Sequence, residues 1–74
     1  MNSLNEYKTT YFVYCVNHFA DRYKLSAKDA FNYLFKYGGM NFLDEFYQVE
    51  HLLSLNDAVE DLTAICKNNG GNLS

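Results

Sequence analysis

The residues whose types and spacing could do chemistry are gathered in one stretch of this 74-residue chain, VEHLLSLNDAVEDL, residues 49–62. His51 and Ser54 lie in it, and three acids follow them: Asp57, Glu60 and Asp61. A Ser–His–acid triad needs the base within hydrogen-bond reach of the nucleophile, a third group that orients the base, and a cavity that excludes water. A domain this small has little room for such a cavity. We therefore predict no enzymatic activity, with His51 bonding free carbonyl groups at a helix end and Ser54 capping the next helix.

Cysteine and histidine could also bind a metal. Cys15 and His18 share a helix face at a spacing of three, and folding could bring Cys66 near them. A structural zinc site takes four ligands, typically in close-spaced pairs, whereas this chain has two Cys and two His with no second local pair. We expect no metal and no cofactor. Both cysteines fall within apolar stripes, so we interpret them as reduced core residues.

The charges of the chain limit its partners. The net charge is -3, which argues against nucleic acid because phosphate binding needs a clustered positive surface. Residues 1–37 carry five basic and three acidic groups (+2), while residues 38–74 carry one basic and six acidic groups (-5). No apolar run is long enough to span a bilayer, and the start MNSLNEYK lacks the features of a signal peptide. We expect a soluble, cytoplasmic protein with no membrane partner.

The elements that must position these residues are helices. The chain has no proline, and apolar residues recur at helical spacing throughout, so we predict an all-α fold, a compact single domain of four helices over residues 1–74. The ordered core is expected at about residues 4–69, followed by a loose C-terminal tail. The first helix should span about Leu4 to Tyr23. Ser26, Asn41 and Ser54 are the expected N-caps of the other three helices, and the pairs Gly38–Gly39 and Gly70–Gly71 are expected to end the second and fourth.

Each predicted helix has an apolar side that should face the core. For the first two helices these residues are Phe12, Cys15, Val16, Phe19 and Tyr23, then Ala27, Ala30, Phe31, Leu34 and Phe35. For the last two they are Phe42, Leu43, Phe46, Val49 and Leu53, then Leu55, Ala58, Val59, Leu62, Ile65 and Cys66. The 18% aromatic content indicates a core rich enough for a small domain without a disulfide.

The first helix has a second apolar face. Tyr7, Tyr11, Tyr14 and His18 form a narrow stripe about 100° from the Phe12, Val16 and Phe19 side. A central helix that packs neighbours on both sides would bury this tyrosine stripe. Alternatively, the stripe stays partly exposed and anchors another chain, since Tyr is enriched in interface cores. The sequence leaves both readings open.

The acids of the second half also have two interpretations. Those near a helix N-terminus are favoured there by the dipole, and a solvated face would carry them in any case. A sharper hypothesis is that they form an acidic patch that steers a basic partner. Its members would be Asp44, Glu45, Asp57, Glu60 and Asp61.

The order of three segments carries a family resemblance. These are YFVYCV, LSAKDAFNYLFKYGGMNFLDEFYQVEH and LSLNDAVEDLTAICKNNGG. From about Tyr11 to Gly71 the chain resembles a family of small bacterial helical proteins catalogued only as a domain of unknown function. Genes of that family often lie beside genes for an ADP-ribosyltransferase-like protein, so the resemblance implies a toxin–antitoxin or accessory role. His51 is shared with the relatives, whereas the following residue, often Thr in them, is Leu52 here.

We therefore predict a non-enzymatic protein–protein interaction module with no small-molecule substrate. Its expected contacts are the tyrosine stripe and the five acids. The alternative is a self-associating structural domain whose tyrosine stripe closes a homodimer. A helix-turn-helix DNA binder ranks third, because the candidate reading helix FLDEFYQVEH is acidic, which is unfavourable beside phosphates.

Overall fold

The computed structural model of the chain describes residues 4–73, and over this range it contains five helices and no strand. They are α1 (Leu4–Tyr23), α2 (Ala27–Lys36), α3 (Gly39–Glu45), α4 (Tyr47–Glu50) and α5 (Leu55–Asn68). The all-α prediction is confirmed. The expected count of four helices changes only because the predicted third helix is divided into α3 and α4.

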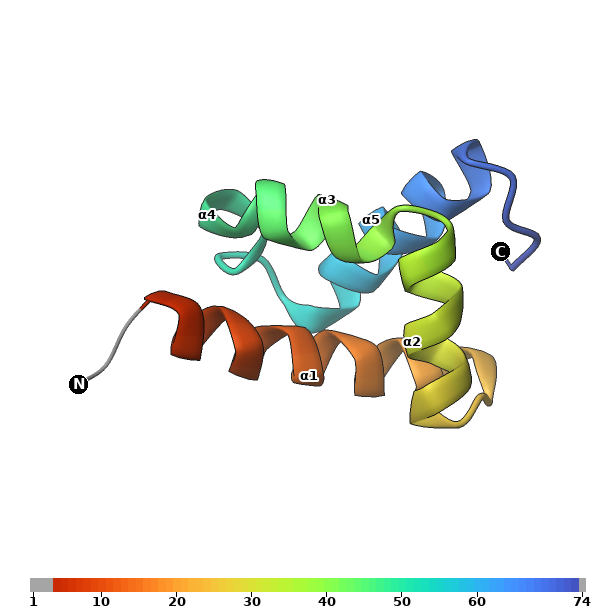
Figure 1. Cartoon of the computed structure of the whole chain (residues 1–74), viewed down its shortest axis with the longest axis horizontal. Helices are drawn as coiled ribbons and strands as arrows, with labels where there is room; N and C mark the ends of the chain where they lie inside the picture. The colour runs from red at the N-terminus through yellow and green to blue at the C-terminus, as the bar shows by residue number, and fades with distance from the viewer. Residues whose placement is uncertain (1–3, 74) are drawn as a thin grey trace.

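α1, the longest helix, lies along one side of a small globule that the other helices complete (Figure 1). α2 stands across the C-terminal end of α1, and α3 and α4 run back above α1 towards its N-terminal end. α5 packs behind, against both α1 and α3. None of the helices in residues 4–73 is long and apolar enough to cross a membrane.

The core lies where α1, α2, α3 and α5 meet. α1 contributes Cys15, Val16 and Phe19, and α5 contributes Ala58, Val59, Leu62 and Cys66. The apolar sides predicted for these two helices are confirmed at these positions. Both cysteines are buried and free, as expected for core thiols.

The two serine caps form as predicted. The backbone N–H of Asp29 donates to Ser26 Oγ at 3.0 Å, and that of Asp57 donates to Ser54 Oγ at 3.0 Å. Each bond satisfies a backbone donor that a helix N-terminus leaves free. The sequence therefore fixes where α2 and α5 begin.

The prediction that Asn41 caps the third helix is wrong. α3 begins at Gly39, and Gly38 before it has a left-handed conformation with φ 84°. A Cβ on Gly39 would lie 2.9 Å from Leu34 Cδ2 and 3.2 Å from Cys66 Sγ. The glycine pair thus ends α2 and also lets α3 start in close contact with the core.

The predicted apolar side of the third helix is wrong beyond Leu43. The helix breaks at Phe46, whose backbone (φ -107°, ψ 22°) leaves the helical region. The buried residues that follow Leu43 are Tyr47 and Glu50, four and seven positions later, while Val49 is exposed. Phe46 and Leu53 are also exposed. Leu43, Tyr47 and Glu50 share one helical side, next to the side of Phe46, Val49 and Leu53 on which the apolar pattern had centred the prediction.

The apolar side of α2 also differs from the prediction. Ala30 and Leu34 are buried, but Ala27, Phe31 and Phe35 are exposed. The core instead takes the other flank of α2, where the ring of Tyr33 stacks on Phe19 with centroids 5.8 Å apart. Tyr37 then packs on Tyr33 at 4.9 Å. Tyrosines occupy the places that the hydrophobic pattern assigned to phenylalanines.

Residues 69–73, after α5, fold back on α2. The N–H groups of Gly71 and Gly70 donate to the carbonyls of Cys66 (2.8 Å) and Lys67 (3.1 Å), the two bonds of a Schellman motif. Beyond it, the N–H of Leu73 donates to Tyr33 Oη at 3.1 Å, and the Leu73 side chain packs against the core. The sequence suggested a loose tail, but the described part of it is held by these contacts.

Candidate functional site

The tyrosine stripe of α1 divides into exposed and packed members. Tyr7 is 54% exposed and Tyr14 is 56% exposed. Tyr11 and His18, the other two members, are half-buried. The stripe is therefore only partly core, and two of its rings are presented to solvent.

Tyr11 packs inward, against α4. Its ring meets Tyr47 edge to face, with centroids 5.5 Å apart and planes at 77°. Its hydroxyl is buried and makes no hydrogen bond with oxygen or nitrogen of a described residue, and the Cys15 thiol is its polar neighbour. Burial, that thiol and the charges of Glu50 and Asp61 all raise the Tyr11 pKa. Tyr11 is therefore the member of the stripe that packs against α4, and it is not presented to solvent as Tyr7 and Tyr14 are.

The five candidate acids fall into two groups, marked by two ion pairs with α1. Lys8 Nζ lies 2.5 Å from Asp44 Oδ1 near the start of α1, and Arg22 Nη1 lies 3.0 Å from Glu60 Oε2 near its end. Fourteen residues of helix separate Lys8 from Arg22, which is about 21 Å along the axis. Asp44 and Glu45 on α3 therefore lie at one end of α1, and the acids of α5 border its middle and its other end.

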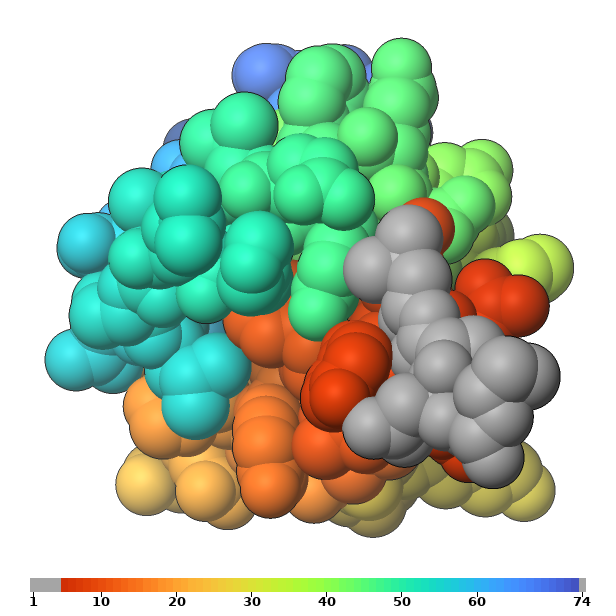
Figure 2. Space-filling model, turned by 90° about the vertical axis from the view of Figure 1, so that its left-hand side faces the viewer, coloured from red at the N-terminus to blue at the C-terminus, as the bar shows by residue number. Residues whose placement is uncertain are grey.

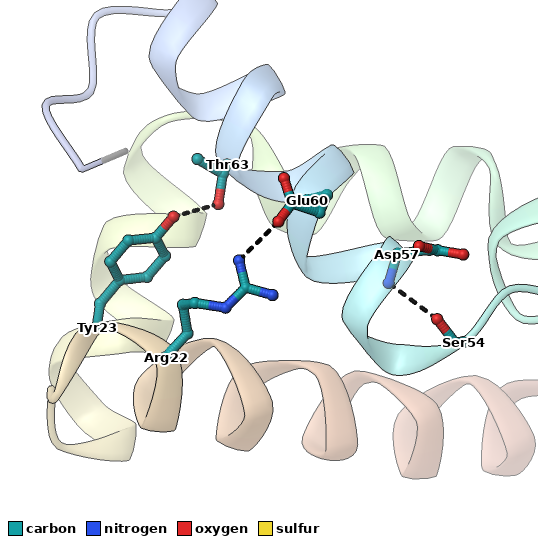
Figure 3. Close-up of polar contacts among 6 residues, drawn as sticks. All are labelled: Arg22, Tyr23, Ser54, Asp57, Glu60 and Thr63. Atoms are coloured by element: carbon teal, nitrogen blue, oxygen red, sulfur yellow. Dashed lines mark hydrogen bonds and ion pairs between the residues drawn. The ribbon is translucent and has the colours of Figure 1, made fainter.

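The acidic turns of α5 stand beside α1 on the face drawn in Figure 3. There the Arg22–Glu60 pair and the hydrogen bond between Tyr23 Oη and Thr63 Oγ1 (2.7 Å) join the two helices. Asp57 is exposed in the first turn of α5 and forms no ion pair with the residues of 4–73. Its carboxylate is thus available to a basic partner.

Asp61 points towards a different environment, the buried Glu50 of α4. Glu50 is only 5% exposed, and its Oε1 atom has no hydrogen-bond partner within the described residues. Burial first, and then a hydrogen bond and repulsion from Asp61, raise the Glu50 pKa to about 7. Asp61 therefore belongs to a buried carboxyl pair at the α4–α5 joint as much as to any acidic surface.

His51 and Ser54 occupy helix ends, as the sequence predicted. His51 Nδ1 lies 2.6 Å from the carbonyl oxygen of Tyr47, and its ring stacks on the Tyr47 ring at 4.5 Å. Ser54 Oγ accepts the N–H of Asp57 in the cap of α5 (Figure 3). Both side chains thus have structural partners.

The structure also exposes apolar residues that the sequence assigned to the core. One set projects from α4 and the segment after it, which cover the upper left of the face in Figure 2. In this set, called the apolar tip below, Val49 is 60% and Leu52 is 77% exposed, and Phe46 and Leu53 complete it. The sequence showed these apolar residues, but it did not show that the core takes the neighbouring side of the helix, with Leu43, Tyr47 and Glu50.

A second unpredicted feature is an open apolar groove of about 500 Å³ between α1 and α2. Phe12, Val13 and Val16 of α1 line it together with Phe31 of α2 and Met40 of α3. No local sequence signal marks it, because it forms only where three helices meet. Among residues 4–73 no group of three or more His, Cys, Asp or Glu side chains is placed to hold a metal ion.

Fold and surface together define a small all-α domain with an exposed aromatic flank on its longest helix and acids on the neighbouring one. The chain belongs to the family described as "Protein of unknown function (DUF3791)", whose model matches residues 10–69. This confirms the expected resemblance to a family of unknown function over most of the chain. No curated protein and no solved structure matches the chain.

Proposed function

We propose that this domain is a non-enzymatic protein-binding module that docks a partner on the flank of α1 beside α5. The observation that carries the proposal is the exposure of Tyr7 and Tyr14, two large aromatic side chains of which more than half is open to solvent. Exposed tyrosines offer a large, stiff apolar surface with a polar tip, which suits an interface.

The charge beside these rings favours a partner with basic groups. Asp57 is exposed without an ion pair among the described residues, and Glu60 is shared with Arg22. Carboxylates at the rim of an interface raise the association rate of a positively charged partner more than they raise affinity. Charge reversal at Asp57 should therefore slow association and reduce its salt dependence.

The resemblance to the family supports one partner in particular. We infer that the domain acts as an antitoxin-like or accessory protein for an ADP-ribosyltransferase-like protein encoded by a neighbouring gene. Binding by surface contact fits that role, because neutralising or assisting an enzyme requires only a complementary surface.

Co-expression of the chain with the product of its neighbouring gene, followed by affinity capture, tests the proposal. We expect a complex that is lost when Tyr7 and Tyr14 are both changed to Ser. The matched control is Phe35→Ser, which removes a more exposed aromatic ring from α2 and should leave the complex intact. Absence of any complex, or equal loss in the control, would refute it.

The alternative, a homodimer closed by the tyrosine stripe, predicts a different result for the isolated domain. Light scattering should then give the mass of two chains, and Tyr14→Ser should reduce it to one. The exposure of Tyr14 is compatible with both proposals, so the two measurements are best made on the same variants.

A further inference from the structure

The groove between α1 and α2 is apolar, open and unfilled by any described residue. Val13 and Phe31 form its rims and are both exposed, while Met40 contributes the wall from α3. Such a concave apolar surface favours an occupant that brings large apolar side chains, since each buried Å² of apolar area is worth about 25 cal/mol. Its position, on α1 and α2 alone apart from Met40, separates it from the α5 side of the molecule.

The charge at the groove has one sign. Lys28 is the charged residue that lines it, and no carboxylate does. Within residues 4–73 Lys28 forms no ion pair. An occupant that carries a carboxylate next to its apolar side chains would therefore complement the groove in charge as well as in polarity.

The same chain carries a segment with this chemistry. Among the residues whose exposure the structure describes, the apolar tip (Phe46, Val49, Leu52 and Leu53) is the densest set of exposed large apolar side chains, with four in eight residues. The exposed acid Glu45 immediately precedes it. In Figure 1 the tip lies at the end of the molecule away from α2.

We propose that the apolar tip of one copy of this chain docks in the α1–α2 groove of a second copy, with Glu45 of the tip facing Lys28. The interface is heterologous, because groove and tip are different surfaces of the chain, so a pair of copies keeps one free groove on one copy and one free tip on the other. Association then continues head to tail with rising concentration until a ring closes or a short filament forms. This interface is distinct from the α1–α5 surface assigned above to a protein partner.

Mixing two complementary variants of the full chain tests the proposal. Phe31→Glu places a charge in the groove, and Leu52→Glu places one in the tip; both positions are exposed, so both variants should fold. By sedimentation velocity we expect the native chain to grow in mass with concentration and each variant to stay monomeric. An equimolar mixture should form a heterodimer and nothing larger, since it holds one intact groove and one intact tip.

Two controls separate this effect from added charge alone. Asn32→Glu and Asn56→Glu add the same charge at exposed positions outside the groove lining and the tip, and both should associate as the native chain does. Lys28→Gln should weaken association by about two- to fivefold, the range for a partly exposed ion pair. Val13→Glu and Val49→Glu form a second pair if circular dichroism shows that either first variant is unfolded.

The outcomes are decisive in either direction. A native chain that remains monomeric up to its solubility limit overturns the proposal. So does a mixture of the two variants that stays monomeric, or a single variant that still associates, because either result would indicate a symmetric interface or a different surface.

Discussion

The half-buried carboxyl group of Asp61 on α5 is a close neighbour of the buried carboxyl group of Glu50 on α4, at the joint between the two helices. Glu50 is almost fully buried, and the side chains that face it from α1 are Tyr11 and Cys15, which bring no positive charge. Burial raises the pKa of the Cys15 thiol to about 11, so it stays neutral as well. The pair is therefore most stable when it retains a proton.

This arrangement predicts that stability falls as the pH rises towards neutrality. The Glu50 pKa is about 7 in the folded chain, whereas the ordinary value for a glutamate, which applies to the unfolded chain, is 4.5. Between these two pH values the folded protein holds a proton that the unfolded chain has released. The stabilisation is fully present below about pH 4.5 and is lost as the pH rises through about 7. Other carboxylates titrate in the acid range, so a variant is needed to isolate Glu50.

Glu50→Gln provides that comparison, because the amide keeps the shape and cannot ionise. We expect the variant to gain stability relative to the native chain as the pH rises, by up to about 3 kcal/mol. Urea denaturation at about pH 5 and pH 8 measures the difference. Glu45→Gln, at an exposed carboxylate, is the control, and a Glu50→Gln effect that did not change with pH would contradict the prediction.

A second prediction concerns two tyrosine hydroxyls, one with a hydrogen-bond partner and one without. Tyr11 Oη is buried without an oxygen or nitrogen partner among the described residues, whereas Tyr23 Oη lies 2.7 Å from Thr63 Oγ1. Tyr11→Phe should therefore be neutral or stabilising, and Tyr23→Phe should cost about 1 kcal/mol. Thermal unfolding of the two variants and the native chain measures these changes in stability. A larger loss of stability in Tyr11→Phe than in Tyr23→Phe would contradict the prediction and mean that the Cys15 thiol is a strong hydrogen-bond partner of Tyr11.

The turn between α1 and α2 contains a strained residue, which gives a third prediction. Lys24 has φ 57°, the left-handed region, while the N–H of Leu25 donates to the Ala20 carbonyl at 2.9 Å to close the helix. A left-handed conformation costs a non-glycine residue about 1–2 kcal/mol. Lys24→Gly should relieve most of this and raise the free energy of unfolding by about 1 kcal/mol.

Lys24→Ala is the control for the loss of the lysine side chain, because alanine keeps the Cβ that causes the strain. It should leave stability nearly unchanged. Equal stabilisation by Ala and Gly would show that charge, and not backbone conformation, limits this turn.

How far the sequence predicted the fold depended on whether a feature was local. The caps at Ser26 and Ser54 depend on only a few neighbouring residues, so the sequence predicts them. The apolar stripes of α1 and α5 are long enough to define one buried face of each helix. The prediction for the buried side of α2 was wrong because Tyr33 stacks on Phe19. Only this tertiary contact shows that the core takes Tyr33 and leaves Phe31 outside. Nothing local marked the left-handed Gly38 as the start of α3.

The sequence predicted which residues belong to the candidate site, but it did not predict which of them are exposed. Tyr7 and Tyr14 were identified by spacing, but only the packed structure separates them from Tyr11, which leans on Tyr47. The burial of Glu50 could not be foreseen, because an acid in a polar-looking segment is normally solvated. It is buried because it shares a helical side with Leu43 and Tyr47, a side that the apolar pattern of Phe46 and Val49 did not indicate.

The two ion pairs described above each join a cation of the first half of the chain to an acid of the second half, Lys8 to Asp44 and Arg22 to Glu60. The first half carries +2 and the second -5. α1 itself carries two cations and two acids, so the attraction that it offers to the acidic half is local, at Lys8 and Arg22, and acts within a Debye length of about 8 Å. Because Asp44 is synthesised before Glu60, the Lys8–Asp44 contact is the first of the two that can form on the ribosome.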